Sequence, residues 1–365
     1  MSTIENLQDV GAAPGARHGI VDVDVHPVPS SPDAIRRYMP MPFSERYQGE
    51  RRSMFNNPVH GSRLDSVPPG GGPKGSDPEF LRRQLIDEYG VAYAILLPRT
   101  FCNIHPDPDY GNAIAAAFNE WLVENWLDQN NDDGAFKGCI TINHHDPQHA
   151  VREIERWAGH PHIVQVATDS GARNPFGQRQ YYPIYEAIVR NGLRLGIHPG
   201  TDGMGINHQP SPGYPTHYIE WHSGMSLAFQ AHLTSMVTEG VFERFPELKV
   251  VMVEGGIAWL APMLWRLDSY WKALRSEVPW LTRPPSEYVR DHVRLGTQPL
   301  ERPDSDKDLL NLLEAMDAET VLMFSSDYPH WDFDSPTRAF PPRMRDEMRE
   351  AIFSGNARAF YDLPG

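Results

Sequence analysis

Cysteine is nearly absent from this chain of 365 residues, which contains only Cys102 and Cys139. Two cysteines are too few for a disulfide framework or for a zinc site built from thiolates. The sequence also lacks any run of 18 apolar residues, and its first 19 residues contain no apolar segment of the kind that a signal peptide needs. We therefore predict no membrane span, no secretory leader, and a location in the reducing cytoplasm.

Positive charge is also scarce, because 33 Lys and Arg residues face 48 Asp and Glu residues, a formal net charge of −15. An acidic chain is a poor partner for nucleic acid or for an anionic membrane surface, and we expect neither. Hydrophobic residues make up 40% of the chain, which is enough for a sizeable core. The length allows either two average domains or one large α/β domain.

The composition divides the chain into three parts. Residues 1–19 are rich in Gly and Ala without periodicity, and we predict a flexible N-terminal arm. Residues 20–365 are predicted to form a single domain. Within it, residues 27–78 are rich in Pro, Gly, Arg and Met, and a loop of this length is usually functional or disordered. We predict that this insertion covers, as a lid, the site at which the first strand ends.

Eight apolar segments rich in β-branched residues are predicted to be strands, and each is followed by a segment with helical periodicity. The strands are residues 20–26, 91–97, 136–142, 163–167, 194–198, 250–254, 293–296 and 321–325. The helix before the sixth strand is predicted to run unbroken over 225–245, ending before Pro246. Eight such repeats predict a (β/α)8 TIM barrel with a long insertion after strand 1. The competing fold is a doubly wound sheet, but no Gly-rich phosphate turn follows the first strand.

Polar or ionisable side chains occur where the predicted strands end. They are Asp24, His26, Asn143, His144, His145, Asp169, His198, Glu254, Thr297 and Asp327. In a TIM barrel the chemistry lies at the C-terminal ends of the strands, so these residues are predicted to meet there. Asp22, Asp24 and His26 would point to one side of the first strand, because side chains alternate along it. When buried, they need either a metal ion or neighbouring backbone groups as partners.

Four of these side chains form a candidate metal-binding set: Asp24, His26, His198 and Asp327. Two imidazoles and two carboxylates suit zinc, manganese or iron better than magnesium or calcium. Taken singly, His198 would be a capping or core histidine, and Asp327 would be part of a structural turn. A turn accounts less well for the dense polar and aromatic sequence at 326–331.

Three motifs make the chain resemble the amidohydrolase-related barrels that include aminocarboxymuconate semialdehyde decarboxylase and γ-resorcylate decarboxylase. They are the acid-x-His pair Asp24 and His26, the segment 240–249 that runs into Glu254, and Ser-Asp-Tyr-Pro-His at 326–330. The resemblance implies one catalytic metal held by the four side chains of the candidate set, with an open position for substrate or water. It also implies an oligomer, formed either by identical subunits or with a different partner chain.

Two departures from the family pattern raise a further hypothesis. Many members have His-x-His where this chain has Asp24 and His26, and an acid at the first position is similar to the decarboxylase branch. The sixth strand of those decarboxylases ends in a histidine, whereas here it ends in Glu254. His232 together with Glu254 resembles a smaller branch of dinuclear iron/manganese oxygenases. That resemblance implies a second metal held by His232, Glu254 and His330, although a lone histidine on an apolar helix face is more often a core residue.

The resemblance implies a metal-dependent hydrolase or non-oxidative decarboxylase that acts on a small organic acid. Asp327, Glu254 and His198 are the predicted catalytic residues. A carboxylate would act as base toward water, or Asp327 would protonate the substrate carbon in a decarboxylation. Two alternatives stay open: an O2-activating hydroxylase with two metals, and a metal-stabilised, catalytically idle subunit of a hetero-oligomer.

Candidate substrate-binding residues lie in the loops that follow the strands. Arg99 follows the second strand and Arg173 the fourth, and either would form a bidentate pair with a substrate carboxylate. For any single arginine, a surface ion pair is the simpler interpretation. The loop 199–221, rich in Gly, Pro and aromatic residues, is predicted to form a lid in which Tyr214 and Trp221 contact the substrate.

Overall fold

The computed structural model describes residues 19–49 and 61–364 of the chain. Apart from Gly19, the predicted arm at residues 1–19 lies outside the described residues, and so does the stretch 50–60 of the predicted insertion. No helix within the described ranges combines the length and the apolar character that a membrane crossing needs. The cytoplasmic location and the oligomer remain predictions.

Within the described residues, eight parallel strands form one sheet in chain order. The strands are β1 (Ile20–Val25), β2 (Val91–Leu96), β3 (Phe136–Thr141), β4 (Ile163–Asp169), β5 (Arg194–His198), β6 (Val250–Met252), β7 (Val293–Gly296) and β8 (Leu322–Met323). Backbone hydrogen bonds close the sheet on itself, since Val23 N–H donates to the Phe324 carbonyl at 3.0 Å. His26 N–H likewise donates to the Tyr328 carbonyl at 2.8 Å. The predicted (β/α)8 barrel is confirmed.

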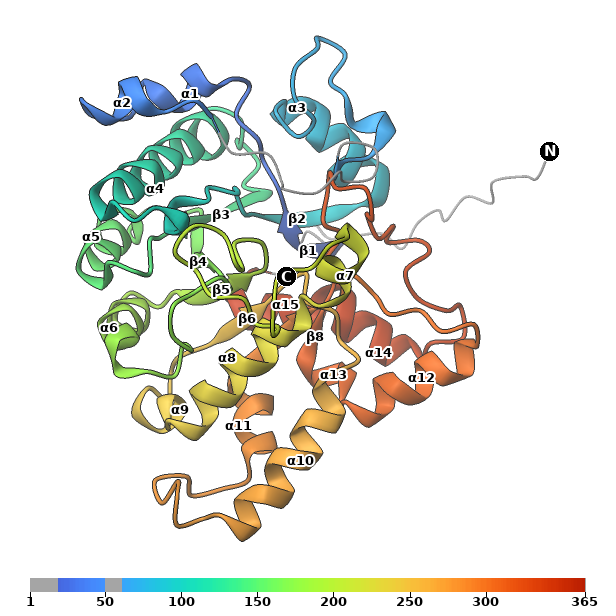
Figure 1. Ribbon diagram of the computed structural model, residues 1–365. Coiled ribbons are helices and arrows are strands. Elements are labelled where there is room, and N and C mark those ends of the chain that lie inside the picture. Colours follow the sequence, from blue (N-terminus) through green and yellow to red (C-terminus); the bar gives the residue numbers. More distant parts are fainter. Residues whose placement is uncertain (1–18, 50–60, 365) are drawn as a thin grey trace, which may run out of the picture.

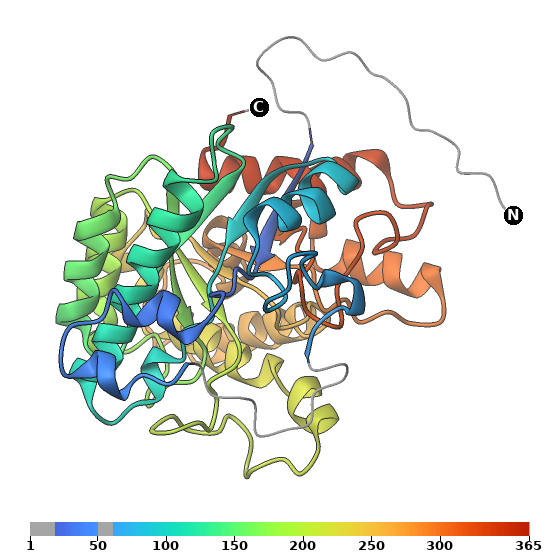
Figure 2. The ribbon, with the colours of Figure 1, turned by 90° about the horizontal axis from the view of Figure 1, so that it is seen from above.

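Helices connect the strands and surround the barrel (Figure 1). They are α1 (Pro32–Arg36), α2 (Phe43–Arg46), α3 (Pro78–Leu81), α4 (Pro108–Leu122), α5 (Pro147–Trp157), α6 (Tyr182–Arg190), α7 (Tyr218–Ser223), α8 (Ser226–Thr238), α9 (Val241–Arg244), α10 (Leu260–Ala273), α11 (Pro285–His292), α12 (Asp306–Ala315), α13 (Ala318–Val321), α14 (Asp346–Glu350) and α15 (Asn356–Tyr361). Short 3₁₀ and π-helical segments are η2 (Leu64–Ser66), η3 (Arg82–Asp87), η4 (Cys102–Ile104), η5 (Val123–Asp128), η6 (Arg179–Tyr181) and η7 (Ala351–Gly355). Figure 2 shows α7 (yellow) at one end of the barrel and the C-terminal helices (red) at the other.

Aspartate caps begin several of these helices. Asp77, Asp107 and Asp146 each accept a hydrogen bond from the backbone N–H three residues later, at 2.9, 3.3 and 3.1 Å. A proline follows each of them at the first helical position. Proline is tolerated there because a backbone N–H at that position would have no hydrogen-bond acceptor within the helix. These local signals determine where α3, α4 and α5 start.

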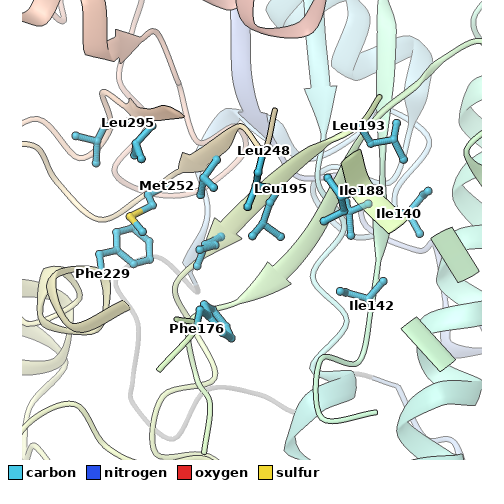
Figure 3. Close-up of a cluster of buried hydrophobic side chains, with 14 of the residues drawn as sticks. Ile140, Ile142, Phe176, Ile188, Leu193, Leu195, Phe229, Leu248, Met252 and Leu295 are labelled. Atoms are coloured by element: carbon cyan, nitrogen blue, oxygen red, sulfur yellow. The ribbon is translucent and has the colours of Figure 1, made fainter. Parts of the chain in front are cut away.

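Apolar side chains fill both sides of the sheet. Between the sheet and the outer helices, Leu195 and Met252 on the strands belong to the same cluster as Ile188 of α6 and Phe229 of α8 (Figure 3). A smaller cluster lies inside the barrel and includes Val21, Val23, Ile95, Val251 and Met323. Parallel strands buried on both faces need such continuous apolar sequence. The result is a rigid platform for the side chains at the strand ends.

Several predicted boundaries are wrong, and backbone conformation explains two of them. The single helix 225–245 is instead α8 and α9, because Gly240 turns into the left-handed region with φ of 73°. The sixth strand ends before Glu254 and the eighth before 325. Glu254 has φ of 60°, which is incompatible with an extended strand.

We expect Gly240→Ala to destabilise the fold and Gly159→Ala to leave its stability nearly unchanged. An alanine held in the left-handed region costs about 1–2 kcal/mol, and a Cβ at position 240 would lie 2.5 Å from Cδ1 of Trp280. The equivalent position at Gly159 has no atom within 4 Å, which makes it the matched control. Urea unfolding of both variants measures the difference, and an equal loss of stability in the two would contradict this role of Gly240.

Candidate metal centre and substrate cavity

Five buried side chains meet at the C-terminal end of the barrel: Asp24, His26, His198, Glu254 and Asp327. β1 positions the first two, β5 ends on the third, and the other two follow β6 and β8. One ligand atom of each residue lies within 4.8 Å of those of the others. The structure thus brings the four predicted metal ligands together, and Glu254 joins them as a fifth candidate.

The imidazole nitrogens face carboxylate oxygens at short range. Nε2 of His26 lies 2.9 Å from Oδ1 of Asp327 and 3.2 Å from Oδ1 of Asp24. Nε2 of His198 lies 2.6 Å from Oε2 of Glu254 and 3.3 Å from Nε2 of His26. Two nitrogens and three carboxylates therefore converge on one small volume, and this donor set suits zinc, manganese or iron.

Backbone carbonyls orient both imidazoles. Nδ1 of His26 lies 2.7 Å from the Leu97 carbonyl, so Nδ1–H donates and Nε2 turns a lone pair toward the cluster. Nδ1 of His198 lies 2.6 Å from the Pro199 carbonyl, which requires the same tautomer. Nη1 of Arg99 lies 2.7 Å from this Nδ1 as well, and that contact would be a hydrogen bond only in the other tautomer. The carbonyl contact is the one that leaves Nε2 free to bind a metal.

Backbone strain is concentrated at this cluster. Glu254 and Asp327 occupy the left-handed region, with φ of 60°. For residues with a side chain, such conformations cost about 1–3 kcal/mol and persist only where the surroundings impose them. The turn at Asp327 is held in part by its own N–H, which donates to the Asp24 carbonyl at 3.1 Å. Strain of this kind is typical of functional sites.

Asp22 links the two sides of the cluster. Its Oδ1 accepts hydrogen bonds from the N–H of Ser326 at 3.0 Å and from the N–H of Asp24 at 3.3 Å. Burial raises the pKa of Asp22 to about 7. Alternation along the first strand predicted that Asp22 shares a face with Asp24, but its bond to the segment after β8 depends on barrel closure and had no signal in the sequence.

The cluster is short of positive charge. Both carboxylate oxygens of Asp24, and Oε2 of Glu254, are buried without a hydrogen-bond partner. Burial, followed by the charge of Asp327, raises the pKa of Asp24 and of Glu254 well above the usual values. Burial also opposes ionisation of Asp327, but His330 and His26 outweigh it and hold the pKa of Asp327 below its usual value.

A cation resolves this imbalance. Burial lowers the pKa of His26 to about 4, and burial also lowers the pKa of His198 far below its usual value, so both rings are neutral. Lone pairs of neutral imidazoles would otherwise point at carboxylate oxygens with no proton between them. A divalent metal would bind both kinds of atom and compensate the charge. The residues present therefore fit a bound metal ion.

His232 does not belong to the cluster, contrary to the prediction of a second metal site. Its Nδ1 accepts a hydrogen bond from Phe176 N–H at 3.2 Å, and its Nε2 donates to the Ser170 carbonyl at 2.7 Å. The ring also stacks on Phe176 with centroids 4.0 Å apart. Because backbone groups engage both ring nitrogens, His232 offers no nitrogen to a metal in this structure.

The other two members of the predicted second set do lie at the site. Glu254 is part of the cluster, and Nδ1 of His330 lies 2.5 Å from Oδ1 of Asp327. His330 thus contacts a predicted ligand of the first metal. Without His232 the dinuclear set is not assembled, and the oxygenase alternative lacks structural support.

A cavity of about 270 Å³ adjoins the cluster. Its lining residues are His26, Pro27, Val28, Pro29, Gly61, Arg99, Phe101, Pro199, Gly200, Asp202, Met204, Tyr218, Trp221, Glu254, His330, Trp331 and Asp332. The predicted insertion contributes to this lining through its first residues, 27–29, and through Gly61. Among the described residues that line the cavity, Arg99 is the single arginine or lysine. Aromatic side chains form much of the remaining cavity wall.

Two of the four predicted substrate-binding residues line this cavity and two do not. Arg99 and Trp221 are in the lining. Arg173 is exposed, and Tyr214 is 71% exposed; neither is among the described residues of the cavity wall. Tyr214 precedes α7, whereas Tyr218 and Trp221 lie on α7 and contribute to the wall. The cavity therefore does not support a substrate role for Arg173 and Tyr214, which stays a prediction.

Arg99 reaches the cluster across a glycine. Its Nη2 lies 3.3 Å from Oδ1 of Asp169, and its Nη1 lies 3.9 Å from Oε2 of Glu254. A Cβ at Gly200, where φ is 135°, would collide with this guanidinium. Gly200 therefore makes room for a side chain of the same protein.

Several cavity residues were not singled out from the sequence, namely Phe101, Asp202 and Met204. Also unforeseen is the contact between α7 and the segment after β8. Nε1 of Trp331 donates to the Tyr218 hydroxyl at 3.0 Å, and Nε2 of His222 lies 3.1 Å from Oδ2 of Asp332. The aromatic density of both segments was the available signal, but their proximity is a property of the closed barrel.

Comparison with known proteins identifies the family of this chain. A family model described as amidohydrolase matches residues 21–363. Over 214 residues the chain is 25% identical to 2-amino-3-carboxymuconate-6-semialdehyde decarboxylase from Dictyostelium discoideum. That match covers 55% of this chain and 53% of the relative, so it spans only about half the length of that protein.

Solved structures share the fold over nearly the whole chain. An amidohydrolase from Mycobacterium avium subsp. paratuberculosis K-10 has a TM-score of 0.70 and 22% identity, covering 94% of this chain and 99% of that one. A dihydroxybenzoic acid decarboxylase from Polaromonas sp. JS666, solved with manganese and the inhibitor 2-nitroresorcinol, has a TM-score of 0.64 and 18% identity, covering 94% and 97%. The family model spans the barrel from β1 to beyond α15, and this chain therefore belongs to the amidohydrolase family.

Proposed function

We propose that this protein is a metal-dependent carboxy-lyase that removes the carboxylate of a small planar organic acid without an oxidant. The observation that carries the proposal is the buried cluster of imidazoles and carboxylates beside a cavity with aromatic walls and one guanidinium. The Dictyostelium relative and the Polaromonas structure are both named as decarboxylases, which supports this choice within the family.

We assign Asp24, His26, His198 and Asp327 to hold the metal. The chemistry that a divalent metal supplies there is Lewis-acid polarisation of the substrate's oxygen atoms. Manganese is the first ion to test, because the Polaromonas decarboxylase contains it and because a set of carboxylates with two imidazoles suits manganese as well as zinc or iron.

Arg99 is assigned to an anionic oxygen of the substrate. Its Nη1 lies 3.3 Å from Nε2 of His198, so the guanidinium and the metal ligands address the same end of a bound acid. Trp221 and Trp331 supply flat walls on which a planar ring would stack. Ligand pockets span roughly 300–1,000 Å³, and a cavity of about 270 Å³ therefore favours a single-ring acid.

Glu254 is assigned to proton transfer in preference to Asp327. Glu254 lines the cavity, whereas Asp327 is fully buried and contacts His26 and His330. Loss of CO2 leaves an electron pair on the substrate carbon, and that carbon must receive a proton. The Glu254 carboxyl is positioned to donate it, since its Oε2 has no hydrogen bond of its own. His198 keeps its predicted place at the reaction centre as a metal ligand.

Hydrolysis is the second candidate, and the position of Glu254 favours it as well. In its ionised form the Glu254 carboxylate would take a proton from water as that water attacks a carbonyl carbon. The two reactions differ in their products, because one releases CO2 and the other consumes water. Both would use the same cavity.

The proposal is tested by anaerobic turnover of ortho-hydroxybenzoic acids and carboxylated muconate semialdehydes with manganese-loaded protein. We expect CO2 release equal to substrate loss and, in D2O, one deuterium on the carbon that lost the carboxylate. Cleavage of esters, lactones or amides without CO2 would favour hydrolysis instead. A fully metal-loaded protein that turns over neither class would contradict catalysis and support an idle subunit.

Asp24→Asn is expected to lower bound manganese to well below one ion per chain, because the amide lacks the charge that the cluster supplies to a cation. His232→Asn is the matched control, and it should bind as much manganese as the wild-type protein. Elemental analysis after reconstitution and gel filtration measures both. Equal metal loss in the two variants would contradict the assignment.

Glu254→Gln is expected to lower kcat by about 10²-fold or more while metal content and KM stay near wild type, because the amide retains the shape but transfers no proton. Glu254→Asp should recover part of the rate. A kcat near wild type in Glu254→Gln would remove Glu254 from proton transfer. Loss of metal in that variant would instead make Glu254 a ligand.

A further inference from the structure

Phe101 lies between two cavities. Among the described residues it is the one that lines both the cavity beside the metal cluster and a second cavity of about 330 Å³. The second cavity is formed by the segment that follows α2, the turn η4 and the start of α4. Phe101 is thus a wall that the two cavities share.

The lining of the second cavity combines apolar and aromatic side chains with four polar ones, Arg46, Gln48, His105 and Asp107. Tyr110 and Ile114 of α4 contribute to it. Nη1 of Arg46 lies 3.1 Å from Oδ2 of Asp107, and its guanidinium carbon lies 4.6 Å from the centroid of the Tyr110 ring. Because this ion pair compensates the charge of Arg46, the cavity fits an apolar extension of a ligand better than a second anionic group.

The backbone of Phe101 is strained. Its φ of 47° lies in the left-handed region, which a bulky residue seldom adopts. Conformations of this kind persist where the surrounding structure imposes them, and they concentrate at functional sites. An aromatic residue is therefore retained at a place where glycine would suit the backbone better.

The segment after Phe101 is clamped on several sides, which explains how the strain persists. Asn103 is buried, and its Nδ2 donates to the Gly171 carbonyl at 2.9 Å and to Oγ1 of Thr201 at 3.0 Å. The Ile104 carbonyl accepts a hydrogen bond from Ile206 N–H at 3.2 Å. Cβ atoms added at Gly111 or Gly205 would collide with the backbone of η4, so this turn cannot shift toward either neighbour.

The segment before Phe101 is held as well. The guanidinium carbon of Arg99 lies 5.6 Å from the centroid of the Phe101 ring, and Arg99 is itself paired with Asp169. The backbone of Phe101 is therefore held on both sides, and the Arg99 guanidinium lies beside its ring.

We propose that Phe101 is a specificity-determining residue, a fixed partition that limits the acid at the metal cluster to one ring. An acid extended by a second ring would need the space beyond Phe101. Removing the ring would join the two cavities and more than double the available volume. The inference rests on the proposed function only in taking an acid to be the ligand at the cluster.

The test compares the binding of benzoate and biphenyl-4-carboxylate to manganese-reconstituted full-length protein by calorimetry. In Phe101→Ala we expect the affinity for biphenyl-4-carboxylate to rise by about tenfold or more, the effect of burying one additional ring. The affinity for benzoate should stay near wild type. Phe101→Leu keeps much of the bulk and should keep the wild-type preference.

Two further variants show whether the second cavity is the space that is gained. Ile114→Phe, which fills that cavity from α4, should cancel the gain when combined with Phe101→Ala. Phe101→Gly should show the same gain and a higher melting temperature than Phe101→Ala, since glycine adopts the left-handed backbone freely. An unchanged ratio of the two affinities in Phe101→Ala, or a gain that persists with Ile114→Phe, would overturn the proposal.

The outcome also separates this inference from the proposed function. If wild-type protein binds neither acid, an acid substrate is ruled out, and the partition is judged on the neutral pair phenol and 4-phenylphenol with the same variants. No shift toward 4-phenylphenol in Phe101→Ala would overturn the partition by itself.

Discussion

Buried negative charge at the mouth of the barrel is the constraint on which the rest of this structure depends. Asp24, Glu254 and Asp327 lie within a few ångströms of one another and of two neutral imidazoles. Like charges this close cannot all be ionised in a buried site without a cation. The hydrogen bonds from Asp327 N–H to the Asp24 carbonyl and from Ser326 N–H to Asp22 help to hold these groups together against their repulsion. A site arranged at this cost in strain and charge is understandable only if it binds something positive.

The architecture was predictable because its signals are local. Each strand is a short apolar run, buried on both faces. Such a run predicts a buried strand without knowledge of the elements that it packs against. Boundaries were wrong where tertiary structure overrides this pattern. Glu254 follows an apolar run directly and Asp327 follows one after two serines, and both residues adopt the left-handed conformation. Gly240 interrupts what its flanking residues predict as one helix, and a single glycine in a helical pattern does not by itself indicate a break.

The site was predictable only as far as the fold could place it. Once a barrel is assumed, the residues at strand ends must converge, and Asp24, His26, His198 and Asp327 do. His232 had a similar local context to that of a ligand, but its ring nitrogens bind backbone groups of a distant loop. Arg99 and Arg173 each follow a strand. In the structure, Gly200 leaves room for the Arg99 guanidinium beside the cluster, whereas Arg173 is exposed. These differences lie in contacts between segments far apart in the chain, which sequence spacing does not encode.

Under the proposed function, reactivity and selectivity would be carried by different parts of this molecule. The metal-binding cluster rests on strand ends, whose positions the hydrogen-bonded barrel determines and whose ligands tolerate little displacement. The cavity walls come from loops: residues 27–29 after β1, Phe101 after β2, Tyr218 and Trp221 on α7, and Trp331 after β8. Loops of a barrel vary without disturbing the sheet, which lets one reaction centre serve different substrates. Phe101 is an exception among these loop residues, because its flanking segments are clamped as firmly as a strand. Under the partition proposed for Phe101, its ring would select by excluding acids that do not fit, whereas the aromatic residues of α7 would select by contact with those that do.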